Sequence, residues 1–155
     1  MIKRSAGTFT AFASAMILCG SAWAAPCSAP NSIARVTNTS IGAYEYVVFD
    51  FIKPPNLPPF SISTASPPFL EDPSGIAVHV AGNRFKKVAF SSVGWMCDIV
   101  EALHLPRSGI KGVKKTGQFE GYITYIIGRR AGSSYLGSYS YDAGPKREIV
   151  LKFSH

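Results

Sequence analysis

Cysteine and histidine are the residue types in this chain that most readily support catalysis, and one pair of them lies close together in the sequence. Cys97 and His104 are seven residues apart. On a helix that spacing separates two side chains by about 10 Å along the axis, whereas a nucleophile and its general base must approach within about 3 Å. Nothing in the sequence indicates that His79 approaches Cys97 instead. We therefore expect no thiol catalysis.

The residues that could bind a metal ion do not occur in a ligand pattern. The three histidines lack ligand spacing, and neither cysteine beyond residue 24 has a second cysteine nearby. Glu71, Asp72 and Ser74 supply oxygen atoms in one stretch, but not the acidic repeat of a calcium loop. Serine-hydrolase, zinc-protease and phosphate-loop motifs do not occur either. The sequence predicts a protein that is not an enzyme and has neither a metal site nor a cofactor.

The first 24 residues have the three parts of a secretory signal peptide. Lys3 and Arg4 precede an apolar stretch of about 13 residues, and Ala22-Trp23-Ala24 supplies the small residues of a signal-peptidase site. The apolar stretch is shorter than the ~20 residues of a membrane-spanning helix. We expect a signal peptide over 1–24 and export to the periplasm, cell wall or extracellular space. The mature chain, 25–155, is expected to form a single domain without a transmembrane segment.

Cleavage would change both the charge and the cysteine content. The 155-residue chain has 16 basic and 9 acidic side chains, and loss of the leader lowers its net charge from +7 to +5. Cys27 and Cys97 remain, and in an oxidising compartment two cysteines commonly form a disulfide. A Cys27–Cys97 disulfide would close a loop of about 70 residues, worth roughly 4 kcal/mol in the chain-entropy model. Two free thiols are the alternative.

The rest of the chain has the pattern of an all-β protein, because short β-branched and aromatic runs alternate with Gly, Pro and Ser clusters. Strands are expected at 33–38, 45–52, 60–64, 75–80, 87–90, 110–115, 122–127, 135–141 and 148–153. Residues 46–49 and 123–127 are apolar on both faces, which predicts central positions. This spacing favours a two-sheet β-sandwich, with an open barrel as the alternative.

One segment breaks the β pattern. Between Met96 and Leu103, four apolar residues follow the i, i+3, i+4, i+7 spacing of a helix, and Pro106 ends the pattern. We expect one short amphipathic helix over 94–103, packed on the sandwich. Its apolar residues are of the kind that enters a core and not of the kind that binds a ligand.

Tyrosines and basic residues give the indications of a binding surface. In the expected strand over 135–141, the tyrosines alternate with Ser and Gly, so we expect them on one face. Tyrosine rings stack on sugars, and clustered positive charge attracts anions. The candidate binding residues are Tyr135, Tyr139, Tyr141, Lys114, Lys115, Arg129 and Arg130. Edge-strand packing and solvated surface are the alternatives, and export together with the lack of an RNA-recognition motif argues against nucleic acid.

Four stretches form a recognisable series along residues 33–153. They read GAYEYVVFDF at 42–51, AGNRF at 81–85, TGQFEGYITYIIG at 116–128 and GPKR at 144–147. Together they resemble the AMIN-like domain family, exported bacterial β-domains related to the targeting module of cell-wall amidases. The first motif departs from the family, which usually has Tyr-Asp-Arg where this chain has Tyr44-Glu45-Tyr46. Any role of that arginine is therefore not carried over.

The resemblance implies a β-sandwich without catalytic machinery that engages the cell envelope. Its motif residues here are Tyr44, Gly117, Phe119, Glu120, Gly121 and Gly128, for which a structural role is expected. Gly117 and Gly121 would permit a bulge or tight turn, with Glu120 paired to an arginine or to backbone amides. We expect an exported domain that binds peptidoglycan or an anionic wall glycan. A module that binds an envelope protein, and an undetected hydrolase or small-ligand carrier, are the alternatives.

Overall fold

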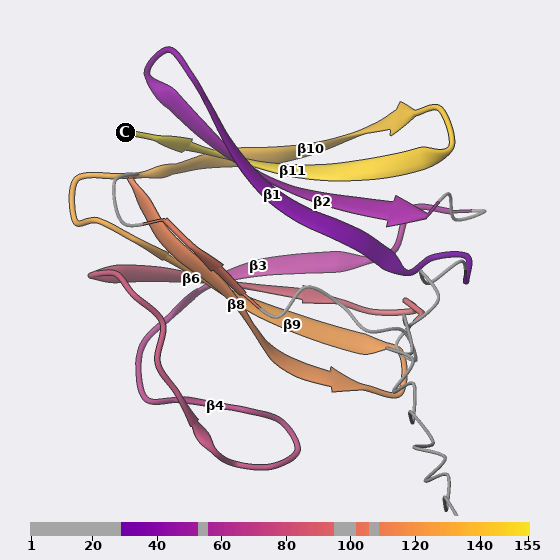
Figure 1. Cartoon of the computed structure of the whole chain (residues 1–155), viewed down its shortest axis with the longest axis horizontal. Helices are drawn as coiled ribbons and strands as arrows, with labels where there is room; N and C mark the ends of the chain where they lie inside the picture. Colours follow the sequence, from indigo (N-terminus) through magenta and orange to yellow (C-terminus); the bar gives the residue numbers. More distant parts are fainter. Residues whose placement is uncertain (1–28, 53–55, 95–101, 106–108) are drawn as a thin grey trace, which may run out of the picture.

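Two antiparallel sheets stack face to face and form a sandwich-like domain, as the strand pattern predicts (Figure 1). A computed structural model describes residues 29–52, 56–94, 102–105 and 109–155. These residues contain eleven strands and no helix. Every predicted strand is present, although the one expected over 75–80 is reduced to two residues.

The first layer is a four-stranded sheet with the order β1-β2-β11-β10. Its strands are β1 (Ile33–Ile41), β2 (Tyr44–Ile52), β10 (Tyr135–Ala143) and β11 (Lys146–Ser154). Two-residue loops close both of its hairpins, and each loop begins with a glycine at positive φ, Gly42 at 60° and Gly144 at 68°. The apolar strand β2 lies centrally, as its sequence predicts.

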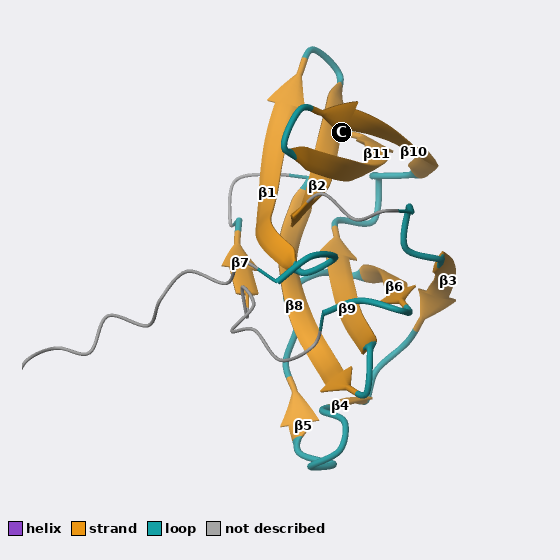
Figure 2. Cartoon of the chain, turned by 90° about the vertical axis from the view of Figure 1, so that its right-hand side faces the viewer, coloured by secondary structure: helices purple, strands orange, loops and turns teal. Residues whose placement is uncertain are grey.

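The second layer is a five-stranded sheet with the order β3-β6-β9-β8-β7. Its strands are β3 (Phe60–Ala65), β6 (Arg84–Phe90), β7 (Ala102–His104), β8 (Ile110–Phe119) and β9 (Tyr122–Arg129). The apolar strand β9 lies centrally, again as predicted. A separate small hairpin of β4 (Phe69–Leu70) and β5 (Ala77–Val78) projects beyond this sheet (Figure 2).

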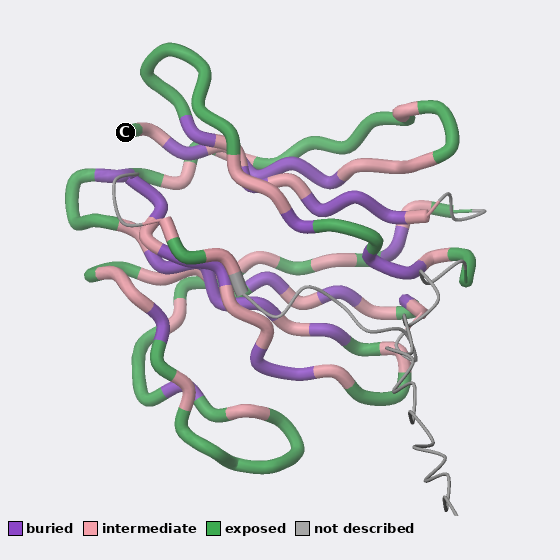
Figure 3. Tube along the Cα trace, viewed as in Figure 1, coloured by how far each residue is buried: buried purple, intermediate pink, exposed green. Residues whose placement is uncertain are grey.

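Side chains from both sheets fill the space between them. Phe49 of β2 packs edge to face against Phe90 of β6 and Tyr125 of β9, with ring centroids 4.9 and 5.2 Å apart. Ile149 and Leu151 of β11 belong to the same buried cluster. Figure 3 shows the buried positions on strands of both layers. The described residues therefore give no support to a small ligand held between the sheets.

The predicted helix over 94–103 is wrong at its C-terminal end. Ala102–His104 forms strand β7, in which Leu103 pairs with Val113 of β8 and packs against the core. Residues 95–101 lie outside the described part of the chain. Pairing with the edge of the five-stranded sheet decides the structure of this end, and such long-range pairing is not encoded in local apolar spacing.

Candidate functional site

The outer side of the four-stranded sheet carries a cluster of tyrosines. Ile149, Leu151 and Phe153 of β11 point into the core, so the alternate residues of β11 and their cross-strand partners point outward. We call this surface the tyrosine face. It comprises Tyr44, Tyr46, Val48 and Asp50 of β2, Glu148, Val150 and Lys152 of β11, Tyr139 and Tyr141 of β10, and Arg35 of β1.

The rings of the tyrosine face are exposed and held by their neighbours. Tyr139 and Tyr141 are each 49% exposed and stack with their centroids 6.4 Å apart at 24°. Tyr44 is 40% exposed, and Nζ of Lys152 lies 3.7 Å from the centre of its ring, a cation–π contact. Because neighbouring groups orient these rings, a ligand that stacks on them would lose little side-chain entropy.

Charged groups are fixed between the rings. Asp50 is buried beneath the face, 2.7 Å from Nε of Arg35 and 3.7 Å from Nζ of Lys146. The Tyr141 hydroxyl donates to the carboxylate of Glu148. This hydrogen bond, with smaller contributions from burial and nearby negative charge, raises the pKa of Tyr141 to about 12. The phenol is therefore a hydrogen-bond donor at neutral pH.

Tyr135 does not share this face, so the expectation of three tyrosines on one side of β10 is wrong. The register of β10 against β11 shifts between Tyr135 and Gly137. Tyr135 therefore lies opposite Phe153, with ring centroids 5.6 Å apart, and packs against the core. One extra residue in a strand reverses the alternation of every residue beyond it.

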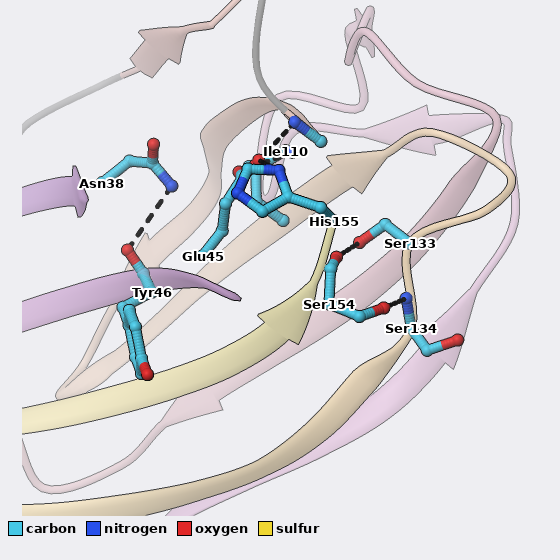
Figure 4. A network of polar contacts seen from close by, with 9 residues as sticks. Asn38, Glu45, Tyr46, Ile110, Ser133, Ser134, Ser154 and His155 are labelled. Atoms are coloured by element: carbon cyan, nitrogen blue, oxygen red, sulfur yellow. Dashed lines mark hydrogen bonds and ion pairs between the residues drawn. The ribbon is translucent and has the colours of Figure 1, made fainter. Parts of the chain in front are cut away.

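Tyr44 and Tyr46 of β2 lie on the tyrosine face, on which Tyr135 was expected. Sequence reasoning did not single them out as ligand contacts, although they alternate with the inward-facing Glu45 and Val47 of β2. Figure 4 shows Tyr46 and Glu45 projecting from opposite sides of β2. The alternation was a usable signal for a shared face, but only the pairing of β2 with β11 brings these rings beside Lys152.

The structure separates the candidate basic residues from the tyrosines. Lys114 and Lys115 are adjacent in β8 of the other sheet, where successive side chains point to opposite sides. Nζ of Lys115 donates to Oε1 of Gln118 at 2.5 Å. Arg129 ends β9, and Arg130 follows it at the surface. These four residues do not form one surface with the tyrosine face.

The family-motif residues around Glu120 shape the β8–β9 hairpin. The register of β8 shifts between Lys115 and Gly117, which is a bulge, and Glu120 and Gly121 form a two-residue turn with φ of 44° and 82°. Phe119 is exposed beside the turn. The expected pairing of Glu120 is not observed, because its carboxylate has no hydrogen bond or ion pair within the described chain.

Gly128, the last motif residue, is required by a close approach. A Cβ at this position would lie 2.0 Å from the carbonyl oxygen of Ala81. Real Cβ atoms do not come so near to backbone oxygen, and a side chain here would push the segment before β6 away from β9. Gly128 therefore holds two backbone segments together.

A buried carboxylate that sequence reasoning missed, Glu45, joins the two sheets. It accepts hydrogen bonds from the backbone amides of Gly109 and Ile110, the latter at 2.8 Å, and lies 3.1 Å from Nδ1 of His155 (Figure 4). A Cβ at position 109 would be 2.8 Å from Oε1, so glycine permits the contact. The available signal was a single acidic residue at an inward position of an apolar strand.

The Glu45–His155 pair has the groups of a general base but lacks a nucleophile in the described residues. Ser133 Oγ donates to the carbonyl oxygen of Ser154 at 2.6 Å, and Ser154 Oγ accepts from the amide of Ser134 at 2.8 Å (Figure 4). No described serine hydroxyl is hydrogen-bonded to His155. The contacts of Glu45 with Gly109, Ile110 and His155 link the two sheets at this point.

The predicted disulfide and signal peptide involve residues outside the described ranges, and the predictions about metal ions and membrane spans are compared with the described ranges alone. Cys27, Cys97 and the leader 1–24 are not among the described residues, so the disulfide and the cleavage stay predictions. Within those ranges, no three His, Cys, Asp or Glu side chains gather as metal ligands. No described helix is long and apolar enough to cross a membrane.

Comparison of the chain with family models, with curated proteins and with solved structures gave no match. The resemblance to the AMIN-like family therefore stays a prediction from the four stretches quoted above. A functional assignment must start from the geometry of the surfaces.

Proposed function

We propose that this protein is an exported, non-enzymatic binding domain of the cell envelope that contacts peptidoglycan or an anionic wall glycan through the tyrosine face. The observation that carries the proposal is two pairs of outward tyrosines on one side of the four-stranded sheet, one pair on β2 and one on β10 with β11 between them, three of the four rings being exposed. Aromatic rings offer a large, stiff, apolar surface with a polar hydroxyl at the edge. The C–H face of a sugar ring can pack on such a surface.

The charges of the face suit a glycan that carries carboxylates. Arg35 is 58% exposed although it is paired with Asp50, Lys146 also approaches Asp50, and Lys152 lies over the ring of Tyr44. The excess of positive over negative charge in the whole chain would attract anionic polymers at moderate salt. The predicted signal peptide and the AMIN-like resemblance support an envelope location.

Retention on purified sacculi tests the proposal. We expect Tyr139→Ala with Tyr141→Ala to weaken binding roughly thirtyfold, because each of the two rings contributes about 1 kcal/mol by stacking. Tyr122→Ala is the matched control, since this tyrosine is 63% exposed but belongs to the five-stranded sheet. An unrelated protein of equal positive charge should be retained less than the wild type.

Two results would remove support from the proposal. Equal retention of the double variant and the Tyr122 variant would show that the tyrosine face is not the contact. Equal retention of the unrelated basic protein would show that charge alone explains binding. A single protein adduct that survives wall digestion after cross-linking in cells would favour the alternative of a protein-interaction module.

A further inference from the structure

A cleft of about 900 Å³ opens between the β4–β5 hairpin and the ends of β6 and β9. Phe69 and Phe85 line it and pack edge to face, with ring centroids 4.9 Å apart. Its titratable lining residues are His79, Arg84 and Arg129, and none of the residues that line it is acidic. Arg84 and Phe85 are adjacent in β6, so their side chains leave this strand on opposite sides, and the arginines border the cleft from a different side than the phenylalanines.

The two arginines of the cleft are direct cross-strand partners. Arg84 of β6 pairs with Arg129 of β9 in the sheet register. Burial, and then the charge of Arg84, lower the pKa of Arg129 below its usual range. Like charges placed opposite each other destabilise a sheet. Neither guanidinium forms an ion pair within the described chain, and the buried Nε of Arg129 has no hydrogen-bond partner there.

The backbone around the arginines is packed too tightly to let them move apart easily. The amide of Asn83 donates to the carbonyl oxygen of Arg129 at 2.8 Å. Gly82 has a φ of 142°, and a Cβ on it would lie 2.7 Å from the backbone nitrogen of Arg129. With the close approach at Gly128, these contacts fix the end of β9 against the segment that leads into β6. A ligand would meet a preformed arrangement.

We propose that Arg84 and Arg129 bind a phosphomonoester at this cleft, with its phosphate between their two guanidinium groups. Guanidinium groups pair with phosphate through two parallel hydrogen bonds. A phosphomonoester carries about −1.5 to −2 charges at pH 7 and balances both arginines, whereas a carboxylate or phosphodiester balances one. His79 and Asn83 supply further donors. The proposal does not rest on glycan binding by the tyrosine face.

Isothermal titration with glucose 6-phosphate at constant ionic strength tests the site. We expect wild-type protein to bind it, and Arg84→Gln and Arg129→Gln each to weaken binding at least about tenfold, as the loss of a charge-assisted bond predicts. Arg130→Gln is the matched control, because it removes the same charge from the neighbouring residue, which does not line the cleft. It should change the affinity less than about twofold.

Two further ligands and a melting experiment without ligand complete the test. Binding to acetate or to phosphatidylglycerol vesicles should be weaker than binding to glucose 6-phosphate; equal or stronger binding to either would overturn the dianion argument. No heat with glucose 6-phosphate at millimolar concentration, or an equal loss in Arg130→Gln, would overturn the site. Without ligand, Arg84→Gln should melt no lower than wild type, and a loss of several degrees would instead assign Arg84 a structural role.

Discussion

The tyrosine face and the cleft differ in the partners of their charged residues. On the tyrosine face, Arg35 and Lys146 approach the buried Asp50, and Lys152 lies over the ring of Tyr44. In the cleft beside the five-stranded sheet, Arg84 and Arg129 face each other without a carboxylate in the described residues. The difference indicates that charge on the tyrosine face is largely paired within the fold and reaches a ligand through the exposed part of Arg35, whereas Arg84 and Arg129 have no ion-pair partner in the described residues.

The largest effect is expected from Glu45, which connects the two sheets. Glu45→Ala would leave the amides of Gly109 and Ile110 buried without their acceptor, and the free energy of unfolding should fall by roughly 3 kcal/mol. Glu45→Gln keeps one acceptor oxygen and should lose less. Urea unfolding measures both. A change below about 1 kcal/mol for Glu45→Ala, similar to that expected for the exposed Glu120→Ala, would refute this junction.

A matched pair of arginine variants tests the contrast between the two surfaces directly. Arg35→Gln leaves Asp50 buried with only the more distant Lys146, so we expect a loss of about 1–2 kcal/mol, moderated by the exposure of Arg35. Arg84→Gln removes no ion pair and relieves repulsion with Arg129, so no loss is expected. Urea unfolding in phosphate-free buffer compares them. Equal losses of unfolding free energy in the two variants would contradict the difference between the tyrosine face and the cleft.

The hairpin turns of the two sheets also differ in the residue type that takes a positive φ. In the two turns of the four-stranded sheet, the first residue is a glycine at positive φ, Gly42 or Gly144. In the β8–β9 turn, the first residue is Glu120, also at positive φ. Asparagine tolerates this conformation better than glutamate, and Asn-Gly is a favoured two-residue turn. Glu120→Asn should therefore stabilise the domain by about 0.5 kcal/mol. Thermal unfolding measures the change, and a lower melting temperature would argue against turn strain.

The smallest effect on stability concerns Tyr141, because its side chain is half exposed. Its raised pKa, about 12 against 10 for an ordinary tyrosine, means that the protonated form is favoured in the folded state. The stabilising contribution is thus present below pH 10 and is lost as the pH rises through about 12. Tyr141→Phe should remove a component of the phenolate absorbance that titrates near pH 12 in the wild type. If the absorbance change near pH 12 is the same in the variant and the wild type, Tyr141 does not have the raised pKa.

The strands were predictable because their signal is local. In β11 the residues Ile149, Leu151 and Phe153 alternate with polar neighbours, and burial of one side follows from that alternation. The apolar runs of β2 and β9 likewise predicted central positions. The helix prediction was wrong at its C-terminal end because Leu103 pairs with Val113 of β8. This pairing depends on a strand outside the local pattern, so apolar spacing around Leu103 does not reveal it.

The candidate site was predictable only in part, because its residues meet through register. Tyr139 and Tyr141 were identified from their spacing. The bulge after Tyr135 places its side chain on the opposite side of the sheet, and residue spacing does not reveal a bulge. Tyr44 reaches Lys152 only through the pairing of β2 with β11. Arg84 lies in the AGNRF stretch and Arg129 directly follows the stretch over 116–128, and their juxtaposition requires the pairing of β6 with β9.

The most direct test of the central claim is to map the glycan contact at residue resolution. Titration of the isotope-labelled mature domain with a soluble N-acetylglucosamine–N-acetylmuramic acid oligosaccharide, followed by NMR, would locate it. The account predicts that the largest chemical-shift changes fall on Tyr44, Tyr46, Tyr139 and Tyr141, with Tyr122 unchanged. Changes confined to the five-stranded sheet, or none at millimolar oligosaccharide, would contradict it.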